Sequence, residues 1–143
     1  MTDPRGGFQE AFTAFMRKGG RWRNCEPDAL RDAWASFVRS CVAGYEGEGE
    51  DYFNELTARS SLERAFQEPS LARFEEEMGA LRSAVAEIDE SFRRILDPDA
   101  FPRVPPSDWW VRGMVKYAGP RLAEELRETH HVHIEPVHRT RGE

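Results

Sequence analysis

The sequence has 143 residues, of which 39% are hydrophobic and 32% are charged, and its formal net charge is −6. This length fits a single domain, and nine Phe and four Trp argue against a disordered chain. No run of 18 apolar residues is present, which excludes a membrane-spanning helix, and the first residues lack the apolar stretch of a secretory signal. We therefore expect a cytoplasmic protein that does not contact a membrane.

The N-terminal part predicts a short helix over about residues 8–18, preceded by a flexible segment at 1–7. Gly19-Gly20 ends this helix, and large apolar side chains recur within it at helical spacing: Phe8, Phe12 and Phe15. Four basic residues then surround Trp22, a composition typical of phosphate or nucleic-acid binding: Arg17, Lys18, Arg21 and Arg23. We favour a structural interpretation, in which the cations complement the helix dipole and Trp22 packs on the core.

Residues 27–43 predict a second helix that buries one aromatic face. Pro27 suits a first helical turn, Gly44 suits the end, and the apolar stripe consists of Leu30, Trp34, Phe37, Val38, Cys41 and Val42. Cys25 and Cys41 form no metal-binding pair, so we expect two free thiols, with Cys41 in the core and Cys25 in a polar loop.

Residues 51–66 predict a helix in two pieces. Ser60 and Glu63 fit a capping box, which places the restart at Ser60. Asp51, Glu55 and Arg59 share one face with Asn54. We favour a solvated Asp51/Glu55/Arg59 ladder there, and a small polar site is the alternative.

The strongest pattern lies in residues 69–96, which predict a long central helix between Pro69 and Asp97-Pro98. Its apolar residues follow alternating steps of three and four: Leu71, Phe74, Met78, Leu81, Val85, Ile88, Phe92 and Ile95. A second face is small, so we expect another helix to approach it: Ala72, Gly79, Ala80 and Ala86. Pairs at i,i+4 are expected between Glu90 and Arg94 and between Asp89 and Arg93.

This seam favours packing inside one chain over a coiled-coil dimer. The flanking positions offer few complementary charges, and Phe fits poorly in a two-stranded seam. Helices in an intramolecular bundle show the same period. The sequence therefore predicts an all-α, single-domain bundle of five or six helices, as a monomer or homodimer.

The C-terminal third begins with a Pro-rich, extended connection at residues 97–106. A helix from Ser107-Asp108 to about Tyr117 follows, and Gly119-Pro120 starts another. The first of these helices carries Trp109 and Trp110. We favour docking of the Trp pair against the N-terminal helices, and a pocket wall is the alternative.

All four histidines lie in the final segment, an extended tail at 130–143. Alternation predicts a short strand there, with Val132 and Ile134 on one face and His131, His133 and Glu135 on the other. The second set contains ligands that zinc or another divalent metal prefers. A Glu-x-x-His spacing occurs once, at Glu128 and His131, whereas di-iron bundle proteins need it twice.

No nucleophile motif or phosphate-binding loop is present in the sequence. Residues 46–90 instead hold thirteen acidic residues against four arginines, a net charge of −9, which argues against nucleic acid and suits a basic protein partner. We therefore expect a non-enzymatic, adaptor- or immunity-like interaction protein without a cofactor, which uses Glu46, Glu48, Glu50, Asp51, Glu55, Glu75 and Glu76. The alternative is a metal-dependent or His-assisted enzyme that uses His131, His133 and Glu135.

Overall fold

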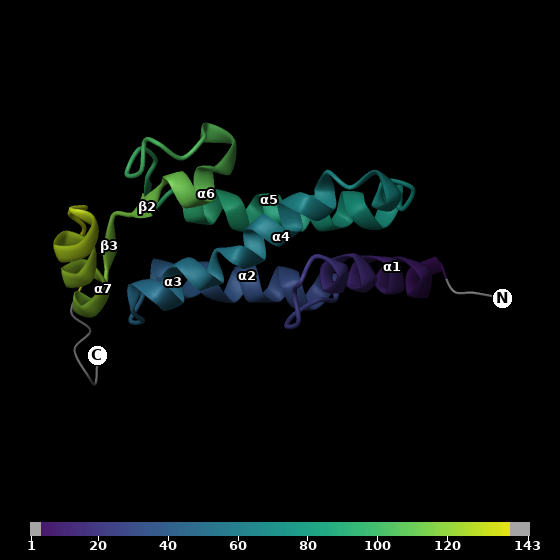
Figure 1. The fold of residues 1–143 in the computed structure, drawn as a ribbon, viewed down its shortest axis with the longest axis horizontal. Coiled ribbons are helices and arrows are strands. Elements are labelled where there is room, and N and C mark those ends of the chain that lie inside the picture. The colour runs from purple at the N-terminus through teal and green to yellow at the C-terminus, as the bar shows by residue number, and fades with distance from the viewer. Residues whose placement is uncertain (1–3, 138–143) are drawn as a thin grey trace.

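Two helices with long apolar stripes, α2 (Pro27–Val42) and α5 (Glu75–Arg93), pack along each other at the centre of the fold (Figure 1). The computed structural model describes residues 4–137. Residues 1–3 and 138–143, which belong to the predicted flexible N-terminus and His tail, lie outside the described part. The prediction of a mostly helical domain with one long helix and a short extended C-terminal segment is confirmed.

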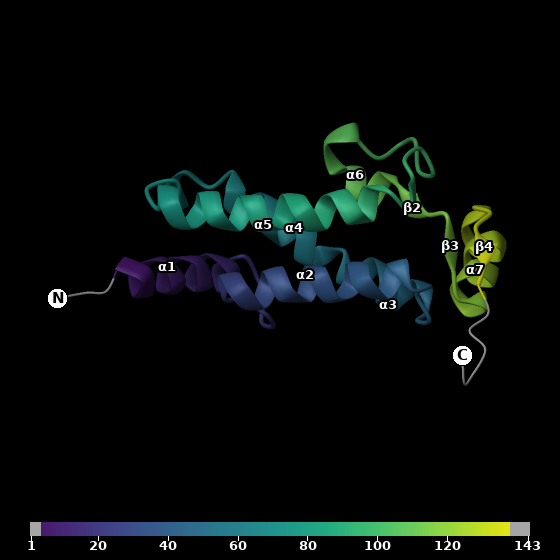
Figure 2. The same cartoon turned by 180° about the vertical axis from the view of Figure 1, so that it is seen from behind.

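The helices form two layers that are elongated along one axis (Figure 2). One layer contains α1 (Pro4–Lys18), α2 and α3 (Gly49–Glu55), and the other contains α5. Helix α4 (Thr57–Phe66) crosses from the first layer to the second. Among the described residues, no helix is both long enough and apolar enough to span a bilayer.

The first layer follows the predicted pattern closely. Helix α1 ends at Lys18, immediately before Gly19-Gly20, but it begins at Pro4 rather than near Phe8. Helix α2 buries its predicted stripe except for Val42, which is 48% exposed, and Gly44 follows it with a φ of 99° that favours glycine. Both thiols are free, as predicted, and both are buried: Cys25 lies in the loop before α2, but its side chain points into the core.

The break between α3 and α4 lies at Leu56, four residues before the predicted restart at Ser60. Leu56 is buried at this corner, and the Thr57 hydroxyl donates to the Asn54 carbonyl at 2.6 Å. Ser60 does not cap a helix; its hydroxyl accepts a hydrogen bond from Trp110. The position of the break is therefore determined by the burial of Leu56 and not by a capping box at Ser60.

Helix α5 is shorter than the predicted 69–96. Pro69 begins a separate 3-10 turn, η1 (Pro69–Leu71), and the acidic residues that complement a helix dipole start only at Glu75. The seam is buried as predicted at Leu71, Met78, Leu81, Val85 and Phe92. The expectation that a helix covers the small face is wrong, because Ala72, Gly79, Ala80 and Ala86 are exposed.

The C-terminal third contains short elements. The helix predicted to start at Pro120 is present, whereas the helix predicted over 107–117 is reduced to a short piece at Trp109–Arg112. The elements are β1 (Leu96–Asp97), η2 (Pro106–Asp108), α6 (Trp109–Arg112), β2 (Met114–Val115), β3 (Tyr117–Ala118), α7 (Pro120–Glu125), the π-helical turn η3 (Leu126–His130) and β4 (Glu135–Pro136). Strands β1 and β2 are antiparallel, with Leu96 opposite Val115, and β3 and β4 are parallel, with Tyr117 opposite Glu135.

Two local predictions in this third are corrected by these pairings. The helix predicted over 107–117 ends at Arg112, because Met114 and Val115 are buried in β2 instead. The Pro-rich segment 97–106 forms turns and is not extended; the Arg112 guanidinium holds it by donating to the carbonyls of Pro102 and Val104.

Candidate functional site

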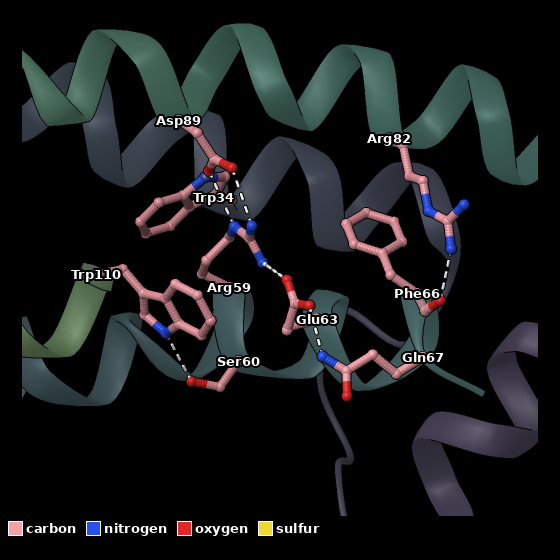
Figure 3. A network of polar contacts seen from close by, with 9 residues as sticks. All are labelled: Trp34, Arg59, Ser60, Glu63, Phe66, Gln67, Arg82, Asp89 and Trp110. Carbon is pink, nitrogen blue, oxygen red and sulfur yellow. Dashed lines mark hydrogen bonds and ion pairs between the residues drawn. The ribbon is translucent and has the colours of Figure 1, made fainter. Parts of the chain in front are cut away.

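A buried ion pair joins the two layers where α4 meets α5 (Figure 3). Arg59 of α4 donates from Nε and Nη2 to the two carboxylate oxygens of Asp89 on α5, each at 2.9 Å. Trp34 of α2 donates from Nε1 to Asp89 Oδ1, also at 2.9 Å. The side chains of Arg59 and Asp89 are 7% and 13% exposed. Three helices are therefore fixed to one another at a single carboxylate.

The rest of the Arg59 guanidinium is also satisfied. Nη1 donates to Glu63 at 3.0 Å, and Glu63 in turn accepts from the Gln67 side chain. Burial raises the pKa of Glu63, but the hydrogen bonds from Gln67 and Arg59 outweigh it and hold the pKa below its usual range. The predicted Asp51/Glu55/Arg59 ladder is wrong, because Arg59 faces the interior.

The Trp pair completes this cluster and is part of the core. Trp110 is 2% exposed, donates to the Ser60 hydroxyl at 2.9 Å, and lies under the Arg59 guanidinium at 4.5 Å from its ring centre. Trp109 stacks instead against Arg93, at 3.8 Å, so the predicted pair between Asp89 and Arg93 is absent. Docking of the Trp pair, which was the favoured interpretation, agrees with these contacts. The cluster therefore holds the helices together, which is a structural role.

The seven predicted acidic residues divide into two groups. Glu46, Glu48, Glu50, Asp51 and Glu55 lie on or beside α3, and we call this group the α3 acidic surface. Glu75 and Glu76 lie in the first turn of α5, which begins at the opposite end of the long axis from α3 (Figure 2). All seven are exposed. The sequence pattern indicated these acidic residues, but it did not indicate that the two groups lie far apart in the fold.

The α3 acidic surface is supported mainly by uncharged donors. The Glu48 backbone N–H donates to Asp51 Oδ2 at 3.3 Å, and the Tyr45 hydroxyl donates to Glu55 at 3.1 Å. Burial, followed by the neighbouring Glu55 charge, raises the pKa of Tyr45. Within the described residues, Glu48 pairs with Arg121 at 3.8 Å, and no ion pair reaches Glu50, Asp51 or Glu55.

An apolar hollow of about 540 Å³ opens beside α3, and we call it the α3 hollow. Three rings from distant segments meet there edge to face: the centres of Phe53 and Phe101 are 6.2 Å apart, and His130 lies 5.7 Å from Phe53. The remaining lining residues are Ala100, Pro102, Arg103, Val104 and Val111. No sequence pattern indicated this hollow, because α3, the Pro-rich segment and η3 meet only in the folded chain.

Trp22 does not pack on the core, contrary to the favoured interpretation of the sequence. It is 80% exposed, in a loop where Gly20 and Asn24 have positive φ. Arg21 turns back to bond Thr57 and Ser61, and burial lowers the pKa of Arg21. The loop borders a depression of about 380 Å³ that Asn54 and Glu55 also line. An exposed Trp flanked by cations is typical of a contact residue.

The tail keeps the predicted alternation of burial, with Ile134 buried and His131, His133 and Glu135 exposed. The predicted strand is shorter, however: only Glu135–Pro136 is a strand, His130 ends η3, and His131 has a φ of 56°. Strand β3 supplies the partner strand that the sequence did not reveal. His133 Nε2 lies 3.4 Å from Glu135 Oε1. Within residues 4–137, however, no three His, Cys, Asp or Glu side chains gather closely enough to hold a metal ion. His138 lies outside the described part of the chain.

Comparison with known proteins adds no family to this description. No protein-family model matches the sequence, and no curated protein and no solved structure is similar to it.

Proposed function

We propose that this chain is a small, non-enzymatic interaction protein that binds a basic protein partner through the α3 acidic surface. One observation carries the proposal: five exposed carboxylates lie between residues 46 and 55, an interval without Lys or Arg. Of Glu48, Glu50, Asp51 and Glu55, only Glu48 makes an ion pair with a described residue. Such a surface retains most of its negative potential and attracts cations of a partner.

The arginines of residues 46–90 do not neutralise this surface. Arg59 is buried against Asp89 and Glu63. The other three contact aromatic rings: Arg64 lies over Phe15, Arg73 over Phe74, and Arg82 over Phe66. None of these four arginines therefore pairs with Glu48, Glu50, Asp51 or Glu55 of the α3 acidic surface. Among the described residues, the cations beside that surface include Arg121, which pairs with Glu48, and Arg23, which lines the same depression as Glu55.

Helix α3 holds these carboxylates in a fixed arrangement. Tyr52 is fully buried between the rings of Phe37 and Tyr45, which anchors the helix to α2. The backbone of Gly119 also donates to the Tyr45 carbonyl at 2.8 Å, which ties the preceding loop to the start of α7. A preorganised surface loses less conformational entropy when a partner binds, and this favours a binding role.

The α3 hollow also supports binding over catalysis. Its lining is apolar apart from Arg103 and His130, so the described lining residues contain neither a carboxylate nor a thiol beside the histidine. The buried polar residues of the Arg59 cluster satisfy one another and hold helices together. Their arrangement suits stability more than proton transfer to a substrate.

The test is a titration with a fluorescein-labelled oligolysine, followed by fluorescence anisotropy. Two variants carry the same charge change in the first turn of a helix: Glu50→Lys in α3 and Glu76→Lys in α5. We expect Glu50→Lys to weaken binding about fivefold, and Glu76→Lys to change it less than about twofold. Equal effects of the two variants, or no binding by the wild type at low salt, would refute the proposal.

A further inference from the structure

We propose that the chain also self-associates, by insertion of Trp22 from one copy into the α3 hollow of a second copy. This inference goes beyond the proposed function, because it needs no foreign partner. It joins two features that the fold leaves unexplained. One is the exposed indole of Trp22, and the other is the apolar α3 hollow.

Trp22 has the properties of an anchor residue. With 80% of its surface exposed, it is the most exposed large apolar side chain among the described residues. Trp and Arg are the residue types most enriched at energetically dominant positions of interfaces. The turn around Trp22 is held by the Arg21 contacts to Thr57 and Ser61, so the indole is presented on a fixed loop.

The α3 hollow has the properties of a receptor for an indole. Its volume of about 540 Å³ exceeds what one Trp side chain fills, and Phe53, Phe101 and His130 offer ring edges and faces to it. Val104 also lines the hollow and is only partly buried. The hollow therefore offers apolar area that an inserted ring would cover.

The charges around the two features are complementary. Lys18 and Arg23 lie on either side of Trp22 in the chain and are exposed. Glu50 is exposed and lies one helical turn before Phe53, which lines the hollow together with Arg103. Insertion of Trp22 would bring the basic loop of one copy toward the α3 acidic surface of the other. This complementarity favours a second copy as the occupant over an acidic or uncharged partner.

A contact between two different surfaces of the same chain is heterologous, and it leads to a closed assembly or to a chain of copies. Its signature is complementation between variants. A copy without the anchor keeps its hollow, and a copy with a blocked hollow keeps its anchor. A mixture of the two therefore retains one functional junction.

The experiment is sedimentation equilibrium of three variants and the wild type, up to about 0.5 mM protein, which detects dissociation constants near 1 mM. Trp22→Ala removes the anchor, Val104→Arg blocks the hollow, and Val42→Ala removes a different exposed apolar side chain as the control. Circular dichroism checks that each variant is folded. Trp22 is mostly exposed and Val104 is outside the core cluster, so melting temperatures should change little.

We expect the wild type and Val42→Ala to associate, and Trp22→Ala and Val104→Arg each to weaken association at least about tenfold. An equimolar mixture of the last two variants should form a one-to-one complex. A monomeric wild type at all concentrations would overturn the proposal, and so would unchanged association of Trp22→Ala. Loss of single-stranded oligonucleotide binding in Trp22→Ala, without any change in mass, would assign the residue to nucleic acid instead.

The two proposals fail separately. Oligolysine binding that depends on Glu50, without any self-association, would support the acidic surface and remove only the role of Trp22. Self-association without oligolysine binding would support the role of Trp22 and remove the α3 acidic surface as a binding site.

Discussion

Replacement of Asp89 by Ala is the sharpest test of how the two layers are joined. The Asp89 carboxylate accepts three hydrogen bonds at 2.9 Å, one from Trp34 and two from Arg59. Its side chain is 13% exposed, so water does not easily replace it. Asp89→Ala therefore leaves three buried donors without an acceptor and one buried cation with a single remaining partner, Glu63.

The expected cost follows from the burial of that cation. Breaking a buried pair by removal of one partner costs about 3–5 kcal/mol. Because Glu63 still offsets part of the Arg59 charge, we expect a loss near the lower end, about 3 kcal/mol. For a chain of this length, such a loss lowers the melting temperature by about 6–12 °C.

Urea denaturation followed by circular dichroism measures this loss, and the adjacent residue provides the control. Glu90 pairs with Arg94, but their side chains are 68% and 71% exposed, so Glu90→Ala should cost less than about 0.5 kcal/mol. The double variant Arg59→Met/Asp89→Leu should cost less than Asp89→Ala alone, because no unpaired charge is left inside. If Asp89→Ala lowers the free energy of unfolding no more than Glu90→Ala does, the ion pair between Arg59 and Asp89 does not stabilise the fold.

Two further predictions concern single polar side chains, the partly exposed Glu63 and the buried Tyr52. The pKa of Glu63 is lowered on folding, so its contribution to stability is present above its ordinary value near 4.5 and is lost as the pH falls through the lower folded pKa. Stability of Glu63→Gln should therefore fall less steeply with acid than that of the wild type in urea titrations between about pH 5 and pH 3; parallel curves would contradict this. The Tyr52 hydroxyl is fully buried, and among the described residues no hydrogen bond of good geometry reaches it; its contact with the Val115 backbone is a weak one. Tyr52→Phe should leave the free energy of unfolding unchanged or raise it by up to about 1 kcal/mol, and a loss greater than that would show a hidden partner.

The sequence was most informative where one element packs on one neighbour. Most residues of the apolar stripes of α2 and α5 were predicted correctly, because a helical period records which face is buried. Val42 and the small residues of α5 show the limit of this reasoning. A pattern identifies a suitable face, but the presence of a covering element depends on the rest of the chain.

Contacts between segments that are distant in the chain could not be predicted from the sequence. Local i,i+4 spacing assigned Arg59 to Glu55 and Arg93 to Asp89, whereas the crossing of α4 and α5 joins Arg59 to Asp89 across 30 residues. A buried charge without a partner costs far more than an exposed pair that is not formed, so the buried Arg59 pairs with Asp89 and Glu63. The α3 hollow was missed for a similar reason, since it forms only when Phe53, Phe101 and His130 meet.

Acidic residues were recognised as a possible binding surface from composition alone, but their positions needed the fold. Glu75 and Glu76 lie at the far end of the molecule from α3, so one partner that covers α3 does not also need to reach them. The structure thus separates the predicted acidic residues into the α3 acidic surface, which is the candidate binding site, and Glu75 and Glu76, whose variants serve as controls in binding experiments.

Hydrogen–deuterium exchange with and without bound oligolysine tests the binding role of α3 most directly. The amides of Gly49–Glu55 should exchange more slowly in the complex, while those in the first turn of α5, from Glu75 onward, should be unchanged. Protection that lies on α5 instead of α3, or no protection in either helix, would contradict the assignment of the α3 acidic surface as the site of partner binding.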